Sequence, residues 1–178
     1  MKSLRVVGLL MAAMGLLFST TASAQVPEEA QAWLNRLETV EGRELSEREM
    51  TSLIAAMKEI EAMEDESINT DSPNMFSAIA ANDAARGAIE KQGFTPESFE
   101  SVVNNLVLAM GALAMEGQKA EIEQAMAQLE AMKGQLPEAQ YQMLEKQVMG
   151  TVKLFQRAPE SNVRLVEKYQ SELEAIGQ

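Results

Sequence analysis

The 178-residue chain contains no cysteine and no histidine. Without these side chains it cannot form disulfides, zinc–thiolate sites or histidine metal sites, and Ser-His or Cys-His nucleophilic catalysis is excluded. The glycines are too scattered to form a phosphate-binding loop. We therefore predict no catalytic residues, no metal site and no cofactor. An enzyme that uses only carboxylates stays as a lesser alternative, because acidic residues are abundant.

Aromatic residues make up only 4% of the chain, and no segment alternates apolar and polar residues with period two. Alanine, methionine, glutamate and glutamine are plentiful instead, and these residues lose little side-chain freedom in a helix. Apolar residues recur at helical spacing, as in the predicted core stripe of Ile122, Ala125, Met126, Leu129 and Met132. We predict an all-α fold, a single compact domain of about seven amphipathic helices that pack mostly as antiparallel neighbours.

Proline, glycine and capping signals set the expected helix boundaries. Prolines followed by glutamate precede several periodic segments, and glycines such as Gly93 and Gly134 follow others. Ser46 and Glu49 have the spacing of a capping box. The predicted helices span residues 27–40, 47–64, 73–92, 96–116, 118–133, 137–156 and 160–176.

Residues 1–24 have the organisation of a cleaved secretory signal peptide. Lys2 and Arg5 precede an apolar stretch, and the small residues at 22–24 form a cleavage site. The apolar stretch is shorter than the ~20 residues that a membrane span needs. We therefore expect an exported protein, periplasmic in a Gram-negative host and otherwise secreted, with its helical domain at residues 25–178.

The exported domain would be strongly acidic. Removal of Lys2 and Arg5 from the 15 basic residues leaves 13 against 27 acidic residues, a net charge of −14. Such a charge repels nucleic acid and anionic lipid surfaces, so we expect neither as a partner. Residues 64–74 combine acidic and turn-forming residues and are predicted to form a loop.

The most hydrophobic segment beyond residue 24 is NNLVLAMGALAM at 104–115. Its apolar part is only about half as long as a membrane span. We expect a central helix packed on both sides, and no membrane span in the exported domain. A second apolar stripe lies opposite the core face of this helix, and a similar stripe lies on the helix after Pro137. The residues of the two stripes are Asn104, Leu108, Gly111, Met115, Met143, Gly150 and Leu154.

Two interpretations of these stripes remain open. The stripes either pack helices closely within a bundle, or they form an apolar groove in which methionine adapts to partners of varied shape. We expect an exported protein that binds other proteins or peptides without catalysis, through this second apolar surface or through its acidic exterior. The alternative is a carrier of a small apolar ligand between the helices at 96–116 and 137–156. The sequence leaves the oligomeric state open.

Asp83 and Arg86 form the most notable polar pair. They are three residues apart in a predicted helix, among small apolar residues. We expect them to form a partly buried structural ion pair. A catalytic role for Asp83 would require a second carboxylate across a cleft, which a sequence does not show.

Overall fold

The computed structural model of the protein describes residues 28–63, 75–135 and 137–176. Within these ranges the chain forms nine helices and no strand, which confirms the predicted all-α fold. The predicted signal peptide at 1–24 and the predicted loop at 64–74 lie outside the described residues. The helices are α2 (Glu28–Leu37), α3 (Glu47–Glu61), α4 (Met75–Ala81), α5 (Asp83–Lys91), α6 (Pro96–Gly117), α7 (Lys119–Ala131), α8 (Glu138–Phe155), α9 (Glu160–Lys168) and α10 (Gln170–Ala175).

Two of the predicted helices are divided in the structure. The helix expected at 73–92 breaks at Asn82, whose backbone is extended and whose side chain accepts a hydrogen bond from the Ala85 N–H at 3.0 Å. The helix expected at 160–176 breaks at Tyr169, which lies between α9 and α10. Asparagine competes with a continuous helix because its side chain caps the backbone locally. The spacing of apolar residues continues across Asn82, so it did not predict the break in the helix there.

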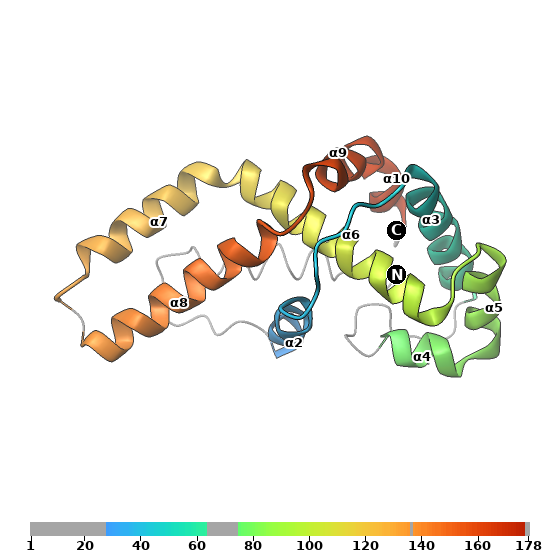
Figure 1. The fold of residues 1–178 in the computed structure, drawn as a ribbon, viewed down its shortest axis with the longest axis horizontal. Helices are drawn as coiled ribbons and strands as arrows, with labels where there is room; N and C mark the ends of the chain where they lie inside the picture. Colours follow the sequence, from blue (N-terminus) through green and yellow to red (C-terminus); the bar gives the residue numbers. More distant parts are fainter. Residues whose placement is uncertain (1–27, 64–74, 136, 177–178) are drawn as a thin grey trace.

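The fold is organised around α6, the longest of the described helices (Figure 1). Thr95 and Ser98 form a capping box at its start, and Pro96 occupies the first turn. Helices α3, α8 and α9 all pack against α6, and most of its side chains from Phe99 to Gly111 are buried. α6 has the length and composition of a membrane-spanning helix, yet more than half of its most apolar 18-residue stretch is buried inside the fold. The predicted central helix, packed on more than one side, is confirmed.

Aromatic rings join α2 and α4 to the first half of α6. The ring of Phe76 packs edge-on against Trp33, with centroids 6.1 Å apart, and against Phe99, with centroids 6.4 Å apart. Edge-to-face packing of this kind adds to the stability gained from burial alone. The Arg36 guanidinium lies 4.6 Å from the centre of the Phe76 ring and forms an ion pair with Glu100. These contacts fix α2 against the body of the fold.

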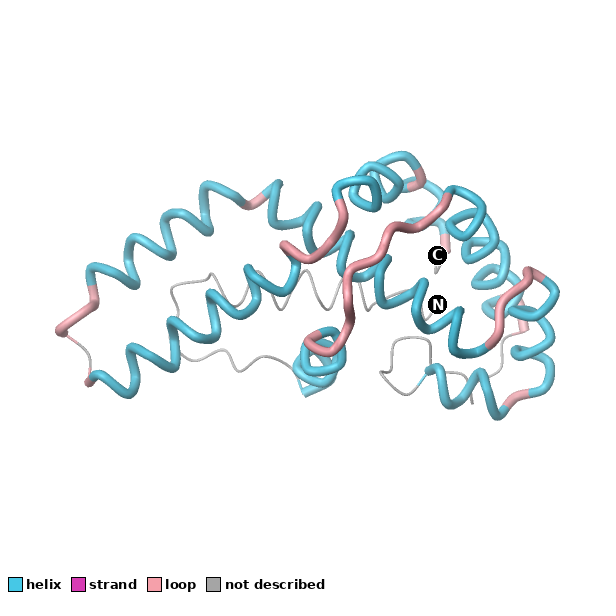
Figure 2. The backbone as a smooth tube through the Cα atoms, viewed as in Figure 1, coloured by secondary structure: helices cyan, strands magenta, loops and turns pink. Residues whose placement is uncertain are grey.

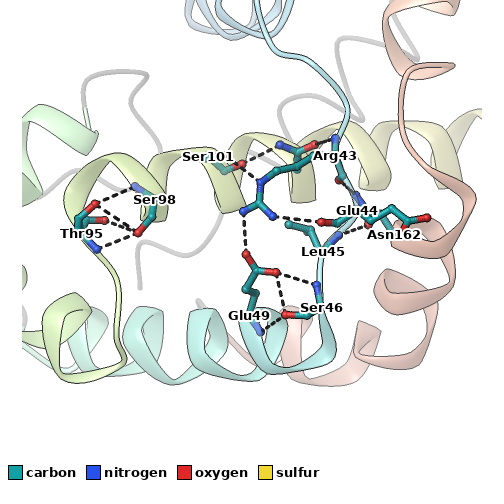
Figure 3. Close-up of polar contacts among 10 residues, drawn as sticks. Arg43, Glu44, Leu45, Ser46, Glu49, Thr95, Ser98, Ser101 and Asn162 are labelled. Atoms are coloured by element: carbon teal, nitrogen blue, oxygen red, sulfur yellow. Dashed lines mark hydrogen bonds and ion pairs between the residues drawn. The ribbon is translucent and has the colours of Figure 1, made fainter.

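The segment between α2 and α3, residues 38–46, passes over α6 without helical structure (Figure 2). The Arg43 backbone N–H donates to Oδ1 of Asn105 on α6 at 2.8 Å. From the other side, Oδ1 of Asn162 on α9 accepts from the Leu45 N–H at 2.7 Å, and its Nδ2 donates to the Arg43 carbonyl at 2.8 Å (Figure 3). Asn162 is fully buried, so its two hydrogen bonds are made without competition from water. Two asparagines thus hold the segment between α6 and α9.

A glycine permits the same segment to approach the connection between α8 and α9. A Cβ atom on Gly42 would lie 2.0 Å from the carbonyl oxygen of Arg157, well inside the van der Waals limit. The Arg157 guanidinium also donates to the Glu38 carbonyl at 2.7 Å. The 38–46 segment and the α8–α9 connection are therefore packed directly together.

The predicted capping box at the start of α3 is confirmed. The Glu49 carboxylate accepts a hydrogen bond from the Ser46 N–H at 2.8 Å, and the Ser46 hydroxyl accepts from the Glu49 N–H at 3.2 Å. The Arg43 guanidinium donates to the same carboxylate at 2.9 Å (Figure 3). Burial raises the pKa of Glu49, but the hydrogen bonds from Ser46 and Arg43 outweigh burial and hold this pKa below its ordinary value.

Candidate functional site

Helices α7 and α8 form an antiparallel hairpin that projects from the body of the fold (Figures 1 and 2). Gly134, in the turn between them, has a φ of +82°, a left-handed conformation that favours glycine. The two helices pack against each other, and Ile122, Leu129 and Tyr141 are among their buried residues. The Tyr141 hydroxyl donates to Glu130 at 3.1 Å and so links α8 to α7. We call this buried contact between α7 and α8, formed by Ile122, Leu129 and Tyr141 among others, the seam.

The exposed large apolar side chains of the described residues all lie on this hairpin. They are Met126 on α7, Met132 at its C-terminal cap and Met143 on α8, with exposed fractions of 38%, 37% and 64%. We call these three residues the hairpin methionines. In the body of the fold, Met50 and Met75 are 0% and 2% exposed. Exposure of methionine is therefore a property of the hairpin.

The prediction that Met126 and Met132 belong to a core stripe is wrong, although it holds for Ile122 and Leu129 of the same stripe. Helix α7 packs against α8 and contacts the preceding helix α6, and it extends beyond the body of the fold beside α8 alone (Figure 1). A helix with one neighbour buries a narrow stripe and leaves the flanking positions in water. The available sequence signal was that Ile122 and Leu129 are the only apolar residues in 118–135 other than alanine and methionine.

The structure separates the seven residues of the two predicted stripes. Leu108 and Leu154 are 0% and 4% exposed and belong to the core. Gly111 is also buried, and a Cβ atom on it would lie 2.1 Å from Cε1 of Phe155. These three residues therefore serve the close packing of α6 against α8, and the Phe155 ring fills the space beside Gly111.

The other four stripe residues lie in different surroundings. Met143 and Gly150 are exposed on α8, and among the described residues nothing beyond the backbone of α8 itself lies within 4 Å of a Cβ built on Gly150. Met115 is half-buried near the end of α6. Asn104 is 5% exposed, and its buried Oδ1 accepts no hydrogen bond in the described part of the chain. The seven residues therefore do not form one surface, and their role in binding stays a prediction.

Asp83 and Arg86 form the predicted ion pair. The pair is more exposed than expected, because the side chain of Asp83 is 88% exposed and that of Arg86 is 40% exposed. Asp83 is the first residue of α5, where a carboxylate points into solvent and interacts favourably with the helix dipole. Arg86 also donates to the Ala80 carbonyl at 3.1 Å, which joins α5 to α4. The pair is a surface contact that fixes two short helices.

The structure defines the chain as an all-α protein with a projecting helical hairpin. Among its described residues, no three histidine, cysteine, aspartate or glutamate side chains are grouped as a metal site would require. Comparisons with models of protein families, with curated proteins and with solved structures found no match.

Proposed function

We propose that this is an exported, non-catalytic protein that binds apolar segments of other polypeptides through Met126 and Met132. The observation that carries this proposal is the confinement of exposed large apolar side chains to the hairpin. Exposed apolar side chains that gather on one element typically mark an interaction surface. Methionine suits varied partners because its unbranched, polarisable side chain adapts to different shapes.

The position of the two methionines favours binding along the seam. Met126 follows the buried Ile122 by four residues, and Met132 follows the buried Leu129 by three. Side chains at these spacings are neighbours on a helix surface. Each methionine therefore lies at an edge of the seam. An apolar segment bound there would contact the methionines and lie next to side chains that are already buried.

Charge favours a partner segment with basic flanks. Residues 25–178 carry 13 basic and 27 acidic residues, and a cation near this chain is attracted from a distance. The attraction accelerates encounter and favours partners of opposite charge, whereas the apolar contact supplies the lasting affinity. The partner we propose is thus an unfolded or extended segment with large apolar residues between lysines or arginines.

A labelled peptide tests this proposal directly. The probe is a fluorescein-labelled peptide with a leucine and phenylalanine centre and lysine flanks, and its binding is followed by fluorescence anisotropy. We expect the double variant Met126→Glu and Met132→Glu to weaken binding by about tenfold or more, since a charge replaces each apolar contact. The far-ultraviolet circular dichroism should stay unchanged.

The matched control places the same two charges on the body of the fold. Ala81 and Ala84 are exposed on α4 and α5, so Ala81→Glu with Ala84→Glu adds equal charge away from the hairpin. This control should bind the peptide as the unaltered protein does. Equal loss in both double variants would reduce the proposal to a charge effect, and no binding by the unaltered protein would reject it.

The two alternative functions gain no support from the described residues. A carrier of a small apolar ligand needs space between α6 and α8, but the Phe155 ring fills the space beside Gly111. An enzyme that uses only carboxylates needs a shielded acid, whereas the side chain of Asp83 is 88% exposed. We therefore propose neither.

A further inference from the structure

The sulfur atoms of methionine are the groups of this chain that an oxidant reaches most readily. Cysteine, whose thiolate competes for oxidants, is absent from the sequence. The single tryptophan, Trp33, is 0% exposed. The thioether of an accessible methionine takes up one oxygen atom and becomes a sulfoxide, which is polar. An oxidant that meets this protein therefore acts first on exposed methionines.

Burial divides the methionines of the described residues into three groups. Met50, Met57 and Met75 are at most 8% exposed and lie in the core. A second group is half-buried and consists of Met63, Met110, Met115 and Met149. The third group is the hairpin methionines, of which the least exposed is 37% exposed and the most exposed 64%. The fold thus presents its most accessible sulfurs on the hairpin and covers those in the core of the body.

From this distribution we infer that Met126 and Met132 form a site of reversible oxidation that switches off the capture of apolar segments. The inference rests on the proposed function, because these two sulfurs belong to the side chains that we propose to bind the partner. The oxidant is a peroxide such as hydrogen peroxide. The regulation is a chemical change at the binding surface itself.

The reaction is a two-electron oxygen transfer. A lone pair of the methionine sulfur attacks one oxygen of hydrogen peroxide, the O–O bond breaks and an S–O bond forms. The proton of the transferred oxygen moves to the departing hydroxide, which leaves as water. Sulfur is oxidised by two electrons and the peroxide is reduced. In the reverse reaction a dithiol, acting through a methionine sulfoxide reductase, becomes a disulfide and the oxygen leaves as water.

A sulfoxide at Met126 or Met132 weakens binding without unfolding the hairpin. Both side chains contact water in the free protein, so the new oxygen stays hydrated there. When an apolar segment covers it, the oxygen loses this water and gains no hydrogen bond in return, which is unfavourable. The buried residues of the seam, Ile122, Leu129 and Tyr141, contain no sulfur. Oxidation should therefore act on binding and leave the fold intact.

Met143 provides a comparison within the same hairpin. It is the most exposed of the hairpin methionines, so it should be oxidised at least as readily as the other two. It follows the buried Tyr141 by two residues, however, and side chains at this spacing do not face each other on a helix. Its sulfoxide therefore lies away from the seam and should leave binding unchanged.

Mass mapping tests the order of oxidation. The full protein is treated with a graded excess of hydrogen peroxide, freed of peroxide with catalase and analysed by peptide mass spectrometry. We expect the hairpin methionines to gain oxygen at lower doses than Met50, Met57 and Met75 do. Equal rates at the hairpin and in the core would overturn the inference, because the fold would then direct the oxidant nowhere.

Peptide binding tests the effect of oxidation. The anisotropy assay uses the same labelled peptide, which contains no methionine and is added after the peroxide has been removed. Its dissociation constant should rise by about tenfold or more once the hairpin methionines are oxidised. The far-ultraviolet circular dichroism should stay unchanged. Oxidised protein that binds the peptide as tightly as before would overturn the inference and leave the proposed function standing.

Leucine variants assign the effect to individual sulfurs, because leucine is apolar and of similar size but cannot be oxidised. Each protein is compared with itself before and after peroxide, so a change that leucine makes beforehand does not enter the comparison. In Met126→Leu with Met132→Leu, oxidation should change the dissociation constant by less than about twofold. In Met143→Leu, the matched control, the rise should remain about tenfold. Equal rises in both variants would overturn the inference.

Reduction tests reversibility. Oxidised protein treated with dithiothreitol and both stereospecific methionine sulfoxide reductases should regain its original dissociation constant, whereas dithiothreitol alone should have no effect. The thiol cannot alter the protein otherwise, because the chain has no cysteine. Thioethers restored without recovery of binding would overturn the inference. Absence of binding before any oxidation would instead reject the proposed function, and the inference with it.

Discussion

Asn162 should be one of the most sensitive positions in the protein. Replacement by alanine removes both of its hydrogen bonds, and this leaves the buried Leu45 N–H and the carbonyl of the half-buried Arg43 without their partner. Each buried, unsatisfied backbone group costs about 1–3 kcal/mol. We therefore expect Asn162→Ala to lower the free energy of unfolding by about 4 kcal/mol, a large share of the ~5–15 kcal/mol typical of a domain.

Urea unfolding measures this loss, and the chain has a suitable internal probe. Trp33 is its only tryptophan and is fully buried beside Phe76, so its fluorescence reports the loss of the core. With a slope of about 2 kcal/mol per molar urea, a loss of about 4 kcal/mol lowers the midpoint by about 2 M. Far-ultraviolet circular dichroism should give the same midpoint if unfolding is two-state.

Ser161→Ala is the control for this measurement. Ser161 precedes Asn162 in the first turn of α9, but it is exposed and its hydroxyl makes only a surface contact with Glu44 at 3.3 Å. Its replacement should change the free energy of unfolding by less than about 0.5 kcal/mol. If Asn162→Ala also lowers the midpoint by less than about 0.5 M, the asparagine does not hold the 38–46 segment, and the reasoning fails.

Two further predictions concern packing and pH. Gly111→Ala forces the Phe155 ring to move, because the new Cβ would lie 2.1 Å from Cε1. The same urea assay should show a loss of about 1–3 kcal/mol, partly recovered by Phe155→Leu; full stability of Gly111→Ala would contradict the tight contact. The lowered pKa of Glu49 means that its ionised form stabilises the fold above its ordinary value of 4.5, and that this contribution is lost as pH falls through the folded pKa. Glu49→Gln keeps the capping pattern but removes the charge. The melting temperature of this variant should therefore lie below that of the unaltered protein near pH 7, and the two should converge in acid. A difference in melting temperature that is constant with pH would contradict the ion pair with Arg43.

Local signals predicted the helices well. The capping box at Ser46 and the proline in the first turn of α6 concern residues within one turn of each other, and both are present in the structure. The burial of α6 was also predictable, because its apolar residues extend around most of the helix. The division at Asn82 was harder to predict, because small apolar residues continue on both sides of it.

Contacts between distant residues were not predictable from the sequence. The bonds from Asn162 connect residues 117 and 119 positions apart, and no local pattern marks an asparagine for such a role. Met126 and Met132 are exposed because no further helix packs beside them in the described part of the chain. The spacing of apolar residues along a helix does not show how many neighbouring helices will cover it. For the same reason, the stripe on α8 read as one surface, although Leu154 is core and Met143 is exposed.

The crossing of residues 38–46 over α6 also constrains the order of folding. A polypeptide made from its N-terminus presents α2 and α3 about a hundred residues before Asn162, the second of the two asparagines that hold their connection. Closing so long a loop early in folding is entropically unfavourable and slow. We therefore expect the 38–46 segment to be held on one side only, by Asn105 of α6, until α9 has formed and Asn162 closes the other side.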